Sequence, residues 1–135
     1  MRPHTLEGMA TVELTEDTFK STILEGGTVL VDFWAAWCGP CRAFAPIFEK
    51  SSEANPDFVY AKVDTDAQQR LAAAMNIQSI PTLMVFRDGI GVFAQAGALP
   101  GPVLEDLVGQ VRALDMDAIR AEIAAQSAEE TAPVQ

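Results

Sequence analysis

The chain has 135 residues, 49% of them hydrophobic, and 9 Lys and Arg against 19 Asp and Glu give it a formal net charge of −10. This length fits one domain with a buried core. The negative charge disfavours nucleic-acid phosphates and anionic membrane faces, so we expect neither as a partner. No apolar run is long enough to span a bilayer, and residues 1–9 lack the apolar centre of a signal peptide; we therefore expect a cytoplasmic protein.

The first half of the chain alternates predicted strands and helices. Residues 1–9 are polar and patternless, which predicts a flexible arm. A helix capped by Thr15 is expected to end at Gly26–Gly27, and the strand that follows is apolar and β-branched apart from Asp32. The elements predicted here are an edge strand, a helix, a buried strand, a long helix and a second buried strand, at 11–14, 15–24, 28–34, 38–54 and 58–63.

The second half predicts a helix at 66–75, a hairpin of strands 81–86 and 90–96, and an amphipathic helix at 102–114. The full order is β-α-β-α-β-α-β-β-α. Such alternation predicts an α/β fold with a mixed, mostly parallel central sheet and helices on both faces. The final hairpin must contribute an antiparallel pair.

Beyond this region, Asp115 is a candidate cap for a short accessory helix at 115–126. Met116, Ile119 and Ile123 recur at helical spacing. An isolated helix this short is marginal in water, so we expect it to dock on the domain or on a second molecule, away from the cysteines. Residues 127–135 are polar and are expected to be disordered.

The only two cysteines, Cys38 and Cys41, follow a predicted buried strand and open a helix. A helix N-terminus favours a thiolate, and a cysteine one turn later can close a disulfide with it. Half of a zinc site is the alternative. Structural zinc takes four ligands, but the chain has no third cysteine and its single histidine, His4, lies in the arm. We therefore predict a redox pair that needs no metal and no organic cofactor.

Asp32 is an acid on a predicted buried strand, where a charge is costly. Burial should raise its pKa, which suits a group that exchanges a proton with Cys41. The alternative is an acid that is hydrogen-bonded for structure alone. Lys62, on the next strand, is either its functional neighbour or an ordinary strand-edge charge.

Residues 31–41, Val-Asp-Phe-Trp-Ala-Ala-Trp-Cys-Gly-Pro-Cys, closely resemble the active-site signature of the thioredoxin family. The likeness covers roughly 11–114, so we assign 10–114 to one thioredoxin domain. It implies the thioredoxin fold and a monomeric protein-disulfide reductase that a thioredoxin reductase recycles. The alternative is a redox-independent binding scaffold. The likeness continues at Pro46, 61–64, 79–82 and 97–98.

The resemblance also implies roles for individual residues. Cys38 matches the exposed attacking cysteine and Cys41 the buried resolving one; Asp32 matches the acid beneath them, with Lys62 beside it. Pro81 matches a cis-proline that faces the disulfide. Related oxidants carry a histidine between the cysteines, so Gly39–Pro40 implies a reductant. The apolar surface that receives partner proteins is matched by Trp37, Gly39, Pro40, Ile80, Gly97 and Ala98.

Overall fold

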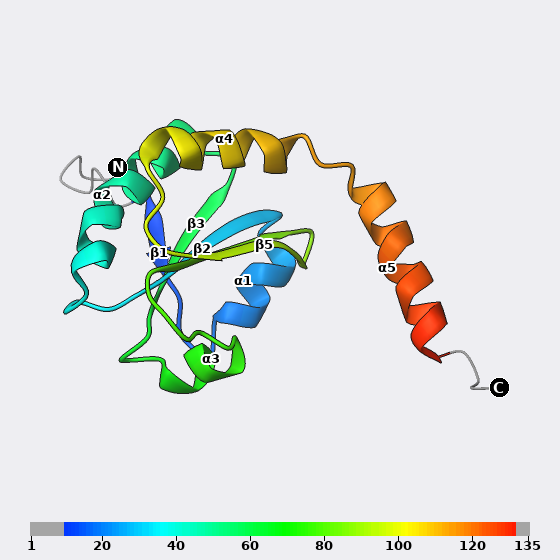
Figure 1. Cartoon of the computed structure of the whole chain (residues 1–135), viewed down its shortest axis with the longest axis horizontal. Coiled ribbons are helices and arrows are strands. Elements are labelled where there is room, and N and C mark those ends of the chain that lie inside the picture. Colours follow the sequence, from blue (N-terminus) through cyan, green and yellow to red (C-terminus); the bar gives the residue numbers. More distant parts are fainter. Residues whose placement is uncertain (1–9, 132–135) are drawn as a thin grey trace.

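The computed structural model describes residues 10–131 (Figure 1). The predicted arm at 1–9 and the last four residues of the predicted tail lie outside the described residues. No helix in the described range is both long and apolar enough to cross a membrane. In chain order the elements are β1 Thr11–Glu13, α1 Phe19–Glu25, β2 Thr28–Trp34, α2 Gly39–Ala54, β3 Val59–Asp64, α3 Gln69–Ala74, β4 Thr82–Arg87, β5 Ile90–Ala96, α4 Gly101–Arg112 and α5 Met116–Thr131.

The five strands form one sheet in the order β1-β3-β2-β4-β5. β3 pairs in parallel with both β1 and β2, whereas β4 is antiparallel to β2 and to β5. Four strands therefore run in one direction and only β4 opposes them. This confirms the predicted mixed, mostly parallel sheet with its antiparallel hairpin.

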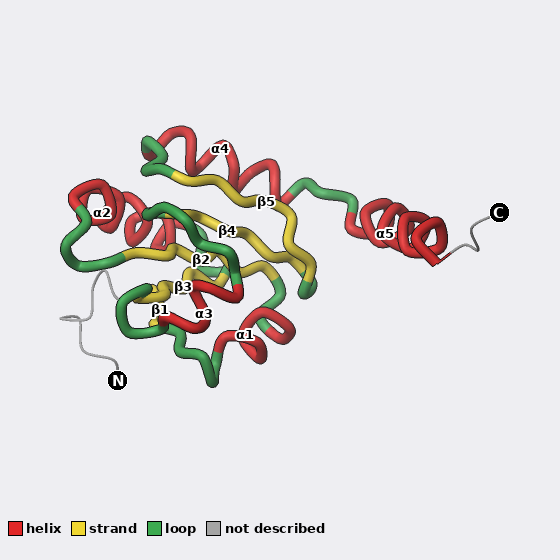
Figure 2. Tube along the Cα trace, turned by 60° about the horizontal axis from the view of Figure 1, so that its bottom comes forward, coloured by secondary structure: helices red, strands yellow, loops and turns green. Residues whose placement is uncertain are grey.

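Helices cover both faces of the sheet, as predicted (Figure 2). α2 and α4 lie on one face and α1 and α3 on the other. Successive residues of β2 alternate between the two cores, since Leu30 packs under α2 and α4 while Val29, Val31 and Phe33 pack under α1 and α3. By the same alternation, Asp32 belongs to the α2 and α4 face.

Two helices begin later than predicted, because side-chain hydrogen bonds form tight turns in the residues just before them. The backbone N–H of Thr15 donates to Thr18 Oγ1 at 2.9 Å, and α1 begins only at Phe19. Asp64 Oδ1 accepts the backbone N–H groups of Asp66 and Ala67, at 2.9 and 3.2 Å, so α3 begins at Gln69. Such local bonds compete with the first turn of a helix.

The C-terminal helix α5 differs from the expectation in length and in docking. It continues to Thr131, so part of the stretch expected to be disordered is helical. Met116 is 6% exposed, but Ile123 is 41% exposed, and Figure 1 shows α5 extending away from the sheet. An ion pair of 3.3 Å between Arg120 and Asp88 joins its start to the β4–β5 turn. The many alanines favour the helix without a packed face.

Arg87, at the end of β4, fixes the junction before α5. Its Nη1 donates to the carbonyl oxygens of Val111 and Leu114 at 2.7 and 3.1 Å. The last carbonyls of a helix otherwise lack partners, and a cation is favourable there. This contact anchors the chain up to Leu114, and among the side chains of α5 that the structure describes only Met116 is buried.

The contrast between Met116 and Ile123 predicts unequal effects on stability. Met116→Ala should lower the free energy of unfolding by about 2 kcal/mol or more, since it empties a buried site. Ile123→Ala should stay within about 0.5 kcal/mol of the wild type. Denaturant unfolding of both variants measures this; equal losses would show that α5 packs along its whole apolar stripe.

Candidate active site

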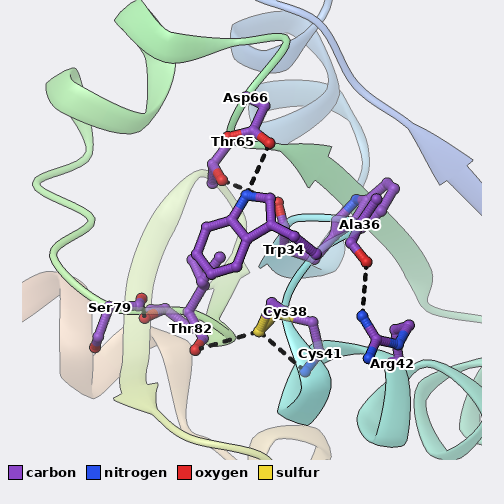
Figure 3. The surroundings of a disulfide bond; sticks show 11 residues. Trp34, Ala36, Cys38, Cys41, Arg42, Thr65, Asp66, Ser79 and Thr82 are labelled. Carbon is purple, nitrogen blue, oxygen red and sulfur yellow. Dashed lines mark hydrogen bonds between the residues drawn. A yellow bond between two sulfur atoms is a disulfide. The ribbon is translucent and has the colours of Figure 1, made fainter.

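The two cysteines lie where the central strand β2 turns into α2, and they are joined by a disulfide (Figure 3). Their Cα atoms are 5.2 Å apart. Cys38 is the N-cap residue of α2, with φ −85° and ψ 113°, and a proline occupies the first turn. Pro40 is tolerated there because the N–H it lacks would have no helical partner.

The sulfur of Cys38 contacts backbone groups at the start of α2 and at Ile80. The N–H of Cys41 donates to Cys38 Sγ at 3.2 Å, and the carbonyl oxygen of Ile80 lies 3.7 Å from the same sulfur. An N–H donor and the positive end of a helix both stabilise a thiolate. The structure places both of these features at the sulfur of Cys38.

Cys38 is less exposed than predicted. Its exposure is 4%, against 2% for Cys41, so a difference in overall exposure does not separate the two cysteines. What separates them is a surface groove of about 460 Å³ that Cys38 lines and Cys41 does not. Cys38 is therefore mostly covered, but it is the cysteine that borders this groove.

Four of the residues predicted to receive partners line the groove: Trp37, Gly39, Pro40 and Ile80. The remaining three lie beside it. The Ile80–Pro81 peptide bond is cis, which confirms that expectation, and the N–H of Gly97 donates to the carbonyl of Pro81 at 2.8 Å. Gly97 has φ +104°, a conformation that favours glycine. Gly97 and Ala98 are exposed next to this contact.

Sequence reasoning missed the residues that fix the tryptophans. Trp37 is 68% exposed, yet its indole N–H donates to Asp66 Oδ2 at 2.9 Å. Thr65 donates to the carbonyl of Trp34 through its N–H and its hydroxyl, at 2.9 and 3.0 Å. Thr65 and Asp66 directly follow β3, at the sheet edge where β2 also ends. That shared edge is the pattern that could have identified them.

Thr65 also lines the groove, and the other lining residues not predicted as site residues come from α3 and the loop after it. They are Ala72, Ile77, Gln78 and Ser79. Together with the indole of Trp37 they form a groove that is mainly apolar with a few polar groups. Such a lining suits an extended peptide that offers apolar side chains.

Asp32 is fully buried, and neither of its carboxylate oxygens has a hydrogen-bond partner among the described residues. Burial raises the pKa of Asp32 to about 7; nearby Lys62 acts against this rise and Glu13 adds to it. Lys62 pairs with Asp32 across β2 and β3, and its Nζ lies 4.8 Å from the ring centroid of Trp34. The sequence thus correctly anticipates a raised pKa, and the alternative of a hydrogen-bonded structural acid finds no partner in the described range.

Among the described residues, no three His, Cys, Asp or Glu side chains cluster as metal ligands would. Both cysteine sulfurs are engaged in the disulfide. The chemistry available at this site is therefore the exchange of two electrons between the Cys38–Cys41 pair and another dithiol or disulfide.

Comparison with known sequences places this site in a family. The thioredoxin family model matches residues 10–126. A candidate thioredoxin 2 of Streptomyces coelicolor is 55% identical over 120 residues, which is 89% of this chain and 90% of that protein. The thioredoxin of Bacillus subtilis is 40% identical over 103 residues, covering 76% of this chain and 98% of its own.

Solved structures agree with the sequence comparison. A thioredoxin of Plasmodium falciparum superposes with a TM-score of 0.69 at 34% identity, covering 74% of this chain and 97% of its own. A mutant thioredoxin of Halobacterium salinarum gives a TM-score of 0.72 at 31% identity, over 78% and 95% of the two chains. With its fold, its disulfide at a helix start and these relatives, the chain belongs to the thioredoxin family and has thiol–disulfide oxidoreductase chemistry.

Proposed function

We propose that Cys38 is the nucleophile that attacks disulfides of substrate proteins, that Cys41 resolves the intermediate, and that a cytoplasmic thioredoxin reductase returns the pair to the dithiol. One observation carries this assignment. Cys38 alone of the two cysteines lines the groove, and its sulfur accepts a backbone N–H at the start of α2. Accessibility and thiolate stabilisation thus favour the same atom.

The reaction proceeds in two exchanges. The Cys38 thiolate attacks one sulfur of the substrate disulfide, forms a mixed disulfide and releases the other substrate sulfur as a thiolate, which takes up a proton. Cys41 then loses its proton and attacks Cys38 Sγ. The second substrate sulfur leaves and is protonated in turn. Two electrons have passed to the substrate, and the protein is left with the Cys38–Cys41 disulfide.

Asp32 is the group we assign to receive the proton of Cys41. It lies on the face of the sheet that α2 covers, and a pKa of about 7 allows it to accept and release a proton near neutrality. Lys62 stabilises the anion that results. A thiol with an ordinary pKa gains most from such a base below pH 8.

The groove residues are assigned to substrate binding. Ile80 places its carbonyl next to the attacking sulfur and precedes the cis-proline Pro81. An extended substrate segment can pair with the backbone here as an added strand. Trp37, Gly39 and Pro40 provide apolar contact on one side, and Gly97 with Ala98 extends the surface beyond Pro81.

A redox-independent scaffold is not favoured as the function. The family relationship extends over most of the chain, and the paired cysteines occupy the start of α2 in bonding distance. A scaffold function would not require that pair.

We predict that trapping separates the two cysteines. Cys41→Ser should accumulate mixed disulfides between Cys38 and substrate proteins, because the resolving thiol is missing. Cys38→Ser should accumulate almost none. Non-reducing electrophoresis followed by mass mapping of the linked cysteine measures this, and equal trapping by both variants would contradict the order of attack.

Reduction of insulin disulfides tests the activity and the recycling partner together. With a bacterial thioredoxin reductase and a reduced nicotinamide cofactor, the wild type should turn over many times. Each single Cys→Ser variant should lose that turnover. If the protein reduces insulin with dithiothreitol as electron source but not with the reductase, the proposed recycling partner is wrong while the thiol chemistry stands.

The raised pKa of Asp32 predicts a pH-dependent gain in stability for Asp32→Asn in the oxidised protein. The carboxyl pKa rises from 3.8 to about 7 on folding, so the folded state binds the proton more tightly. The wild type therefore loses stability as the pH rises from about 4 to about 7, and the loss is constant above that range. Asn at this position removes the loss, on the order of 4 kcal/mol above neutrality.

Urea unfolding at several pH values measures this difference. Asp17→Asn provides the control, since it removes an exposed carboxyl group and leaves the buried one in place. A gain from Asp32→Asn that stays constant from pH 4.5 to pH 8 would contradict the raised pKa. Under the proposed mechanism, the same variant should also resolve mixed disulfides more slowly, with the largest effect at low pH.

A further inference from the structure

Three charged side chains lie in one row across the sheet. In the register of the parallel strands, Glu13 of β1 is opposite Lys62 of β3, and Lys62 is opposite Asp32 of β2. Directly paired residues of neighbouring strands point to the same face of a sheet. Lys62 therefore stands between two acids in this row, one in the core and one at the sheet edge, and its Nζ lies 4.8 Å from the ring centroid of Trp34.

The face on which this row lies is fixed by a neighbouring pair. Thr11 is opposite Tyr60, two residues before Glu13 and Lys62 on their strands, and Tyr60 packs in the core beneath α2 and α4. Since side chains two residues apart share a face, Glu13 belongs to the same side as the active site. Its exposed position at the edge strand gives it contact with water, which Asp32 lacks.

We propose that Glu13 is a positioning residue of the active site, which shares the ammonium group of Lys62 with Asp32 and thereby keeps a proton on Asp32. When Glu13 is ionised, it draws Lys62 toward the sheet edge and also repels a second negative charge in the row. Asp32 ionises more easily when this competitor is removed. The inference rests on the proposed function only where it concerns what Asp32 does for Cys41.

The charge balance around Asp32 supports the direction of this effect. Lys62 lowers the pKa of Asp32 and Glu13 raises it, while burial dominates both. Glu13 has a raised pKa of its own, from burial first, with Lys62 opposing the rise and Asp64 adding to it. The two acids thus compete for one cation.

The other groups facing Asp32 contribute no further charge when the disulfide is closed. β4 offers Leu83 opposite Asp32, and α4 contributes Leu104 and Val108 to the shared core. α2 contributes Phe44 and Phe48 to this core, and its Cys41 is held in the disulfide. Among the described residues, the charged groups acting on Asp32 therefore come from β1 and β3.

Direct titration of Asp32 tests the proposal in the oxidised full-length chain. Carbon-13 NMR of the Asp32 carboxyl group should show its midpoint at lower pH in Glu13→Gln than in the wild type. The shift should be at least about 0.3 pH units, which is the effect of a unit charge two strands away even in bulk water. Two controls accompany it. Glu25→Gln removes an exposed acid from α1, on the opposite face, and should leave the midpoint unchanged; Glu13→Asp keeps the charge and should stay close to the wild type.

A double variant separates sharing of Lys62 from simple repulsion. In a Lys62→Met background only the direct repulsion remains, so adding Glu13→Gln should shift the Asp32 midpoint by less than it does when Lys62 is present. A midpoint that does not move in Glu13→Gln overturns the proposal. So does a shift of equal size in the presence and absence of Lys62.

The role of Asp32 as a base is tested separately, through the pH dependence of mixed-disulfide resolution. If Asp32 is the base, the rate profile of Glu13→Gln should move to lower pH together with the NMR midpoint. If the midpoint moves and the rate profile does not, the coupling between Glu13 and Asp32 stands and the proposed base is wrong.

Discussion

The structure depends on a carboxyl group in a place that water does not reach. Asp32 is fully buried on the central strand β2, with no hydrogen-bond partner among the described residues. A carboxylate there is costly, so the group is held near its neutral form. The fold carries this cost at the strand position that lies under the start of α2. The pKa of this carboxyl group is raised by its burial, and Lys62 and Glu13 on the neighbouring strands modify that rise.

The sheet builds this environment by simple alternation. β2 places Val29, Val31 and Phe33 under α1 and α3, and Leu30 under α2 and α4. Asp32 takes the next position of the second series, between Leu30 and Trp34, and Trp34 packs against the cysteine cluster. α2 begins shortly after β2 ends, so the N-terminus of this helix and both sulfurs lie at the edge of the sheet where β2 ends. The buried acid and the helix start come from one strand–turn–helix unit, and α3 with the loop after it completes the groove.

Much of the fold and of the active site could be predicted from the sequence, because local sequence patterns determine these features. The buried run of β2, the turn with the cysteines and the glycine-containing hairpin predicted the elements and the mixed sheet. What failed depended on packing that no local pattern reports. Cys38 is buried in a cluster that includes Ile80 from a distant part of the chain. α5 extends past its last buried residue because alanines continue a helix without neighbours. The row through Glu13 needs the strand order β1-β3-β2, in which the first and third strands of the chain become neighbours.

The placement of the two tryptophans gives the chain a built-in optical reporter. The sequence contains only Trp34 and Trp37. Trp34 packs against the cluster that includes both cysteines, and Trp37 lines the groove beside Cys38. A disulfide quenches the emission of an indole in contact with it, whereas a dithiol does so far less. The tryptophan emission of the protein therefore originates beside the Cys38–Cys41 pair, and its intensity is expected to follow the oxidation state of that pair without any added label.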